Sequence, residues 1–269
     1  MIQLPDVSLP AQAYQRLETL QATIDQIVDY ADQVAEARRR FRQQNRRDNS
    51  TFREIRAVLT EMCPGARRCA YCEDSCADEV EHIEPKDLYP EKVFVWKNYL
   101  YACGPCNGPK NNLWAVFSDA TGRLTEVQRR RGDPIVPPEP GAPVFINPRR
   151  ENPLEAIELD LIDTFYFLPS GDEGSTDYQR ADYTIKILRL NERDLLPAAR
   201  EEAYRSYRAR LREYIARRDE GASPQELDNL VRALQRMGHP TVWKEMKRQQ
   251  DQMPQLGQLF AQSPESLNW

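Results

Sequence analysis

The spacing of hydrophobic positions predicts a chain that is mostly helical. Residues 11–47 contain no glycine or proline, and apolar side chains recur there every three or four positions, which predicts one long amphipathic helix. Thr51 and Glu54 have capping-box spacing and predict the start of a second, short helix. The helical pattern returns from 178 to about 218 and again after Ser223, which precedes a proline. We therefore expect helices on both sides of the chain's centre.

The middle of the chain follows a different pattern. Residues 63–118 are rich in cysteine and irregular, whereas 132–143 holds five prolines, which excludes a regular helix or an interior strand there. Short strand-like runs follow at 144–146 and 159–168. The predicted organisation has four parts: an N-terminal helical region (1–62), a cysteine-rich core (63–118), a proline-rich connector (119–145) and a C-terminal, mostly helical region with a short β element (146–269).

Composition narrows the class of protein. The chain has 269 residues, and no apolar run approaches the roughly 18 residues of a membrane-spanning helix. Its first ten residues lack the basic and apolar layout of a secretory signal, so we expect a cytoplasmic protein that does not enter the membrane. The net charge of -5 argues against a free-standing protein that coats nucleic acid.

The six cysteines predict a metal site, because cytoplasmic thiols stay reduced and close pairs there hold metal more often than they form disulfides. Four of them form two C-x-x-C pairs, namely Cys69, Cys72, Cys103 and Cys106. Two such pairs are typical of a structural zinc site, in which four thiolates close the coordination shell. Cys63 and Cys76 are predicted to be spare reduced thiols, although Cys76 is near enough in sequence to compete as a ligand.

Three motifs accompany these pairs: Glu-His-Ile-Glu-Pro-Lys at 81–86, Trp-Lys-Asn at 96–98 and Asn-Gly-Pro-Lys at 107–110. In order, spacing and residue type, the region from 69 to 112 resembles the HNH nucleases. More narrowly, it looks like the HNH subunits of Septu and retron-associated anti-phage systems. Ile-Asn-Pro at 146–148 and the run at 183–191 extend this resemblance with less specificity.

The resemblance implies an α+β fold, with a zinc-stabilised ββα-metal (HNH) core inside a mostly helical protein. It also implies hydrolysis of DNA phosphodiester bonds by the effector of an anti-phage complex that has an ATPase partner. In the family positions, Glu81 and Asn107 would hold one Mg²⁺ or Mn²⁺, and Asn98 would orient the loop that carries His82. Many HNH enzymes have aspartate where this chain has Glu81, which leaves the preferred ion open.

Elementary chemistry agrees with these roles. Water is a poor nucleophile at neutral pH, so a base must take its proton, and His82 is the only imidazole within the motifs. A hard cation held by oxygen ligands would stabilise the charge that develops on the phosphate. Lys110, and less surely Lys86, are candidates for contacts with that phosphate in a nucleic acid.

Other interpretations stay open. The same site would serve a stand-alone restriction-type nuclease, or the region could be a non-catalytic zinc module that binds nucleic acid or protein. The basic run Arg38–Arg47 fits either a solvated helix end or a strip that follows phosphates. The arginine-rich helix 200–213 fits a salt-bridged surface or a partner-binding face.

Several single residues have a plainer interpretation. Glu79 and Glu84 are predicted to form a solvated acidic edge, and His239 to be a loop residue. Trp96 and Tyr71 are predicted to pack around the zinc, with base stacking as the alternative.

Overall fold

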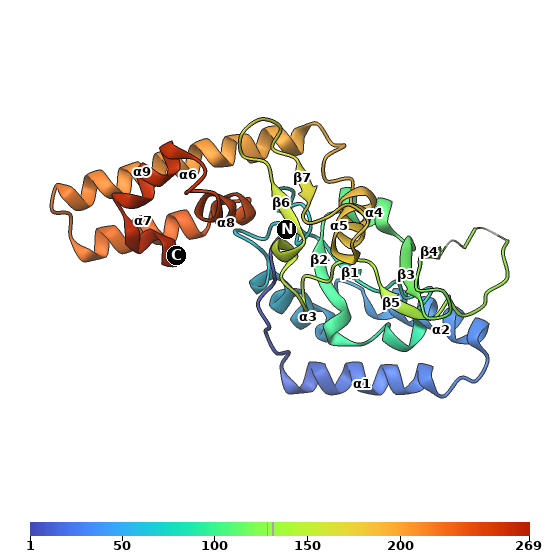
Figure 1. Ribbon diagram of the computed structural model, residues 1–269. Coiled ribbons are helices and arrows are strands. Elements are labelled where there is room, and N and C mark those ends of the chain that lie inside the picture. The colour runs from blue at the N-terminus through green and yellow to red at the C-terminus, as the bar shows by residue number, and fades with distance from the viewer. Residues whose placement is uncertain (128, 131) are drawn as a thin grey trace.

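The computed structural model describes residues 1–127, 129–130 and 132–269, and it combines helices with three small sheets (Figure 1). The α-helices are α1 (Ala11–Asp25), α2 (Tyr30–Gln44), α3 (Ser50–Glu61), α4 (Gly104–Lys110), α5 (Thr176–Ile187), α6 (Leu195–Asp219), α7 (Pro224–Gln235), α8 (Pro240–Arg248) and α9 (Pro254–Ala261). The strands are β1 (Glu79–His82), β2 (Tyr99–Ala102), β3 (Trp114–Ser118), β4 (Leu124–Val127), β5 (Gly141–Pro143), β6 (Ile157–Leu159) and β7 (Phe167–Pro169). The mixed composition agrees with the expected α+β class.

The single helix predicted for 11–47 is wrong, because α1 and α2 are separate. The Asp29 side chain accepts a hydrogen bond from the Asp32 amide and caps a new helix. Ahead of that cap, Val28 is fully exposed, so the apolar stripe of α1 does not run on without a break. α3 likewise begins earlier than predicted, because the Asn49 side chain, and not Thr51, accepts from the Phe52 amide.

The centre of the chain forms a β-hairpin followed by a helix. β1 and β2 pair antiparallel, with His82 opposite Tyr99 and Glu79 opposite Ala102. α4 follows β2 after Cys103, and α3 packs against β2. Helices therefore contact both strands of the hairpin, and all of its residues except Glu79 are buried.

A second sheet, in the order β4-β3-β5, lies within and beside the predicted connector. The proline-rich segment supplies β5, which is an edge strand, as the missing amide hydrogens of proline require. Gly141 allows the pairing, since a Cβ atom there would lie 2.1 Å from the Phe117 carbonyl oxygen. The predicted connector is thus partly structured, by β4 and β5.

The C-terminal half consists of a small hairpin and a helical arm. The strand predicted for 159–168 is instead a hairpin of β6 and β7, because Asp160 accepts hydrogen bonds from the amides of Ile162, Asp163 and Thr164 and turns the chain. The helix predicted for 178–218 is two helices, α5 and α6. In Figure 1, α6 extends away from the hairpins, and α7, α8 and α9 lie alongside it. α7 starts as predicted, with the Ser223 side chain accepting from the Glu226 amide.

Among the described residues, we find no helix with the length and apolar character needed to cross a membrane.

Candidate metal centre and active-site cleft

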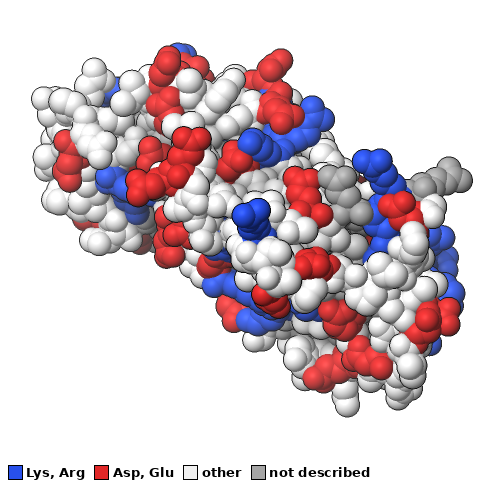
Figure 2. Space-filling model, turned by 45° about the vertical axis from the view of Figure 1, so that its right-hand side comes forward, with Lys and Arg blue, Asp and Glu red and all other residues white. Residues whose placement is uncertain are grey.

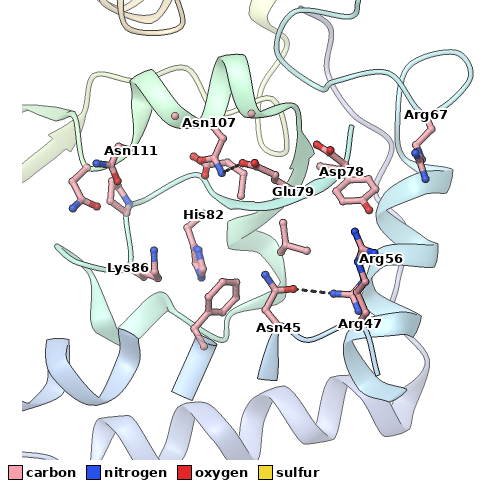
Figure 3. A pocket seen from close by; sticks show the side chains of 18 residues that line it. Asn45, Arg47, Arg56, Arg67, Asp78, Glu79, His82, Lys86, Asn107 and Asn111 are labelled. Carbon is pink, nitrogen blue, oxygen red and sulfur yellow. Dashed lines mark hydrogen bonds between the residues drawn. The ribbon is translucent and has the colours of Figure 1, made fainter. Parts of the chain in front are cut away.

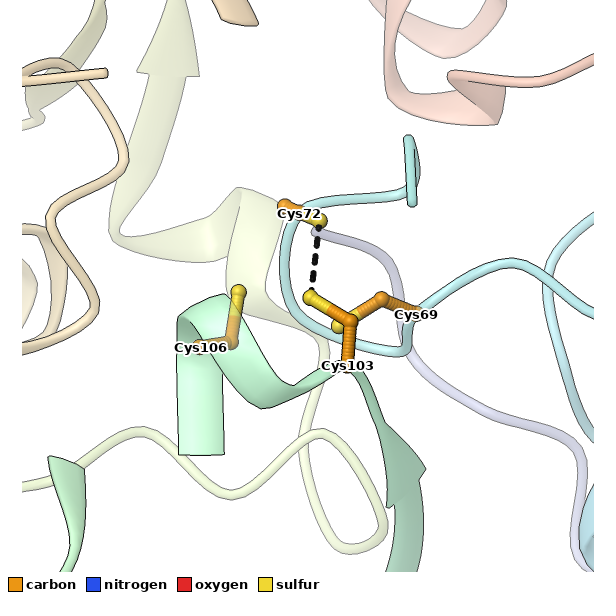
Figure 4. Close-up of side chains that lie close together, drawn as sticks. All are labelled: Cys69, Cys72, Cys103 and Cys106. Carbon is orange, nitrogen blue, oxygen red and sulfur yellow. Dashed lines mark hydrogen bonds between the residues drawn. The ribbon is translucent and has the colours of Figure 1, made fainter. Parts of the chain in front are cut away.

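Four cysteine side chains converge in the core of the protein (Figure 4). The Sγ atoms of Cys69, Cys72, Cys103 and Cys106 all lie within 4.8 Å of one another, all four residues are buried, and none forms a disulfide. The distance between the Sγ atoms of Cys72 and Cys103 is 3.8 Å. Tetrahedral zinc with bonds of about 2.3 Å would place its thiolates about 3.8 Å apart, so these residues fit a structural zinc ion.

Backbone hydrogen bonds hold each pair of cysteines in a tight turn. The Glu73 amide donates to the Cys69 carbonyl, the Ala70 amide donates to the Tyr101 carbonyl of β2, and the Tyr71 amide donates to the Cys69 sulfur at 3.4 Å. Cys103 caps α4 and Cys106 lies in its first turn. The metal centre therefore joins the loop ahead of β1 to the helix behind β2.

The four thiols affect one another's ionisation in opposite directions. Hydrogen bonding with Cys103, and then with Cys106 and Cys69, lowers the pKa of Cys72 well below its ordinary value. Burial raises the pKa of Cys69, and hydrogen bonding with Cys103 raises the pKa of Cys106. From outside the cluster, the Arg193 guanidinium donates to the Cys106 sulfur at 3.1 Å. Arg193 stabilises negative charge on the ligands, a contribution that the spacing of the sequence did not reveal.

The other two cysteines lie outside the cluster, as the prediction of spare thiols required. Cys76 is exposed, and its sulfur accepts from the Arg67 guanidinium at 2.8 Å. Burial raises the pKa of Cys63 to about 12.

A cleft of about 800 Å³ opens beside the metal centre (Figure 3). Glu81, His82, Lys86 and Asn107, which the sequence proposed as site residues, all line it. The His82 side chain points from β1 into this space, near Lys86 and Asn45 (Figure 3). The fold thus brings a base candidate, a carboxylate, an amide and a cation to one solvent-open site.

The His82 imidazole is held in one orientation by its neighbours. Its Nε2 lies 2.9 Å from the Val93 carbonyl oxygen, and the ring packs edge-on against Phe41 and Tyr99. Because a carbonyl oxygen only accepts, Nε2 carries the proton in this contact and Nδ1 keeps its lone pair. Burial lowers the pKa of His82 to about 3, which favours the neutral ring.

Lys110 does not lie where the sequence suggested. It is 0% exposed, its ammonium lies 2.6 Å from Glu81 Oε1, and it donates to the His82 carbonyl at 3.0 Å. The alternation of β1 turns Glu81 and His82 to opposite faces, and Lys110 reaches the strand from α4. Lys110 is therefore a positioning residue beneath the cleft and has no exposed surface for a phosphate.

Glu81 is nearly as enclosed as Lys110. Burial raises the pKa of its carboxyl, while the charge of Lys110 opposes this shift. Glu79 lies two residues earlier on the same strand face, is exposed, and accepts a hydrogen bond from the Asn107 side chain at 2.6 Å. Glu79 therefore lines the cleft and is not simply part of a solvated acidic edge. The sequence could have indicated this, because side chains two residues apart on a strand lie on the same face.

Asn98 holds the loop between β1 and β2. Its side-chain oxygen accepts from the Glu84 amide, and its side-chain nitrogen donates to the carbonyls of Glu84 and Lys92. These bonds shape the segment that presents Val93 to His82, and Asn98 does not line the cleft. Glu84 is buried and paired with Lys92, so its predicted place on a solvated edge is wrong.

The aromatic residues near the centre are core residues. Trp96 and Tyr71 are both buried, Tyr71 against Phe145 and Trp96 against Tyr99. His239 caps α8, and its Nε2 lies 3.4 Å from Asp74. None of these three residues lines the cleft.

The lining of the cleft includes side-chain oxygens of the kind that a divalent cation binds. Within the described part of the chain, the four cysteines are the only close group of three or more histidine, cysteine or acidic side chains. Mg²⁺ keeps several waters and commonly takes only one or two carboxylates together with substrate phosphates. Glu79, Glu81 and Asn107 supply such oxygens, of which Oε1 of Glu81 faces the ammonium of Lys110.

Comparison with known proteins gives one informative match. A segment of 61 residues is 44% identical to the Septu protein PtuB of Bacillus thuringiensis. The match covers 21% of this chain and 23% of that protein, so the chain spans about a quarter of the length of the curated relative. No family model matches the sequence.

Proposed function

We propose that this protein is a metal-dependent HNH-type endonuclease that hydrolyses DNA phosphodiester bonds. The observation that carries the proposal is His82, whose Nε2 faces the Val93 carbonyl and whose ring enters a cleft shared with Glu81 and Asn107. This arrangement leaves Nδ1 free to accept a proton from water. The ββα order of β1, β2 and α4, with cysteines at both ends, supports the family assignment that the motifs imply.

Each side chain has a role in this proposal. His82 acts as the general base, and Asn98 orients it by fixing the loop that holds Val93. Glu81 and Asn107, with Glu79 beside them, hold Mg²⁺ or Mn²⁺, and the four cysteines hold Zn²⁺. When bound, the divalent cation would stabilise negative charge on the phosphate and the leaving oxygen.

The match to a Septu protein supports a role in anti-phage defence. We infer that the chain is the nuclease effector of such a system and works with an ATPase partner. Affinity purification of the full chain from cells that carry its neighbouring genes tests this part. Recovery of a large ATPase in stoichiometric amount supports it, whereas recovery of the chain alone favours a stand-alone nuclease.

Plasmid cleavage tests the catalytic part. Wild-type protein with Mg²⁺ or Mn²⁺ should nick supercoiled DNA, and His82→Ala should lose at least a hundredfold in rate, as expected for a general base. The matched control is His239→Asn, which removes the other histidine but tolerates its left-handed backbone (φ 53°). Equal cleavage rates for wild type and His82→Ala, with zinc retained in both, would reject His82 as the base. No cleavage by the zinc-loaded wild type would favour a non-catalytic zinc module.

A further inference from the structure

A second hollow continues from the cleft along the end of α2. It measures about 550 Å³ and is lined by Arg38, Phe41, Arg42, Asn45, Lys86 and Asp87. Phe41, Asn45 and Lys86 also line the cleft, so the two spaces form one path past His82. We call this second hollow, with the adjoining cleft edge at Arg47, the α2 groove.

The α2 groove contains cations that form no ion pair among the described residues, since its one carboxylate, Asp87, binds Arg38. In the structure as described, neither Arg42 nor Arg47 has an ion-pair or hydrogen-bonding partner, and both are exposed. Lys86 lies 5.8 Å from the centre of the Phe41 ring and has no carboxylate within ion-pair distance among the described residues. Three positive charges therefore face solvent along one path.

Their neighbours on the same helix are paired. Arg39 and Arg40 both bind Glu36, at 2.6 Å, and Arg38 binds Asp87 at 2.8 Å. On the face that Figure 2 shows, basic and acidic side chains are interspersed. Unpaired cations also occur elsewhere in the described residues, for example Arg53 and Arg210, but those of the α2 groove line a hollow that continues into the cleft of His82.

The walls of the path lack a surface on which bases could stack. Apart from His82, the aromatic residues that line the cleft and the α2 groove are Phe41 and Tyr101, and both are buried. Proteins that bind single strands combine a positive groove with exposed aromatic rings for the bases. Here only the positive groove is present, which favours contacts to the backbone of a duplex.

From these observations we propose that the α2 groove binds the phosphates of duplex DNA beside the bond to be cleaved, through Arg42, Arg47 and Lys86. The position of that bond rests on the proposed function, whereas phosphate binding itself does not require catalysis. The contacts are independent of sequence, because they address the backbone alone.

Binding of a fluorescein-labelled 20-base-pair duplex, and of its labelled strand alone, tests this proposal. Fluorescence anisotropy is measured with the full chain between 50 and 300 mM NaCl, without added Mg²⁺ or Mn²⁺. The test variant is Arg42→Ala/Arg47→Ala. The matched control is Arg39→Ala/Arg40→Ala, which removes the same charge from nearby positions on α2 outside the groove. Circular dichroism and zinc content confirm that all three proteins fold.

Each lost phosphate contact should reduce the slope of log K against log salt by about 0.9 for duplex DNA, and therefore by about 1.8 for the test variant. At 0.1 M salt this corresponds to roughly 60-fold weaker duplex binding, whereas the control should weaken it less than fivefold. The wild type should bind the duplex more tightly than the single strand.

Three results would overturn the groove assignment: equal loss in the test and control variants, tighter binding of the single strand, or no binding of either probe by the wild type. The two proposals fail separately. If duplex binding depends on Arg42 and Arg47 but cleavage does not depend on His82, the catalytic proposal fails alone. If cleavage depends on His82 but the test variant binds like the wild type, the groove assignment fails alone.

Discussion

Replacement of Lys110 by methionine should destabilise the protein strongly. Lys110 is 0% exposed and faces Glu81, which is also buried, so the variant leaves a carboxylate in the interior without its counter-charge. Breaking a buried ion pair by removing one partner costs about 3–5 kcal/mol. For a chain of this size, each kcal/mol corresponds to about 2–4 °C in Tm, so Tm should fall by roughly 6–20 °C.

The loss should also depend on pH. Burial already raises the pKa of Glu81, and without Lys110 the folded protein should bind a proton there that the unfolded chain, with a carboxyl pKa near 4.5, does not bind. Stability falls with rising pH wherever the folded state binds more protons, so the deficit of Lys110→Met should be larger at pH 8 than at pH 5.5.

Thermal unfolding followed by circular dichroism, with zinc in the buffer, measures both effects. Lys97→Met is the matched control, because Lys97 pairs with Asp6 at the surface, where such pairs contribute at most about 1 kcal/mol. The double variant Lys110→Met/Glu81→Gln should regain most of the lost Tm. The reasoning is refuted if Lys110→Met costs no more than Lys97→Met, or if the double variant is as unstable as Lys110→Met.

Three further predictions concern the metal centre and its surroundings. The purified chain should contain about one zinc per molecule, as measured by mass spectrometry of the metal. Cys72→Ser should lose this zinc and Cys76→Ser should keep it, since of these two residues only Cys72 lies in the cluster. Equal zinc content in the two variants would contradict the site. With zinc bound, iodoacetamide at pH 8 should label exposed Cys76 but not Cys63, whose pKa burial raises to about 12. Peptide mass spectrometry measures the labelling, and faster labelling of Cys63 than of Cys76 would contradict the prediction. Asn98→Asp should lower the free energy of unfolding, measured by chemical denaturation, by about 2–4 kcal/mol. The carbonyls of Glu84 and Lys92 would lose their donor, and a charge would enter a buried site. A change below about 0.5 kcal/mol would contradict this reasoning.

The sequence predicted the metal cluster well because C-x-x-C spacing is a local constraint. Each pair needs only a tight turn, and the order of the motifs around His82 then limits how the two turns meet. The start of α7 was equally local, since the Ser223 side chain caps its own helix. Where chemistry acts within a few residues, the amino-acid pattern was sufficient.

Contacts between distant segments were not predictable in this way. The sequence pattern does not distinguish the buried ammonium of Lys110 from one on the surface, because its partner Glu81 lies on β1, far from α4 in the sequence. The break between α1 and α2 depends on the Asp29 cap, which the spacing of apolar residues does not reveal. Glu84 looked like part of an acidic edge, yet the loop fixed by Asn98 encloses it.

The turn that carries Cys72 also anchors the helical arm. Glu73, the next residue, is buried and accepts from both the amide and the hydroxyl of Thr241 at the start of α8. A metal ligand and the residue that attaches α8 are therefore adjacent in the sequence. Because the same turn contacts the metal centre and α8, loss of the zinc ion should loosen the attachment of the helical arm as well as the turn itself.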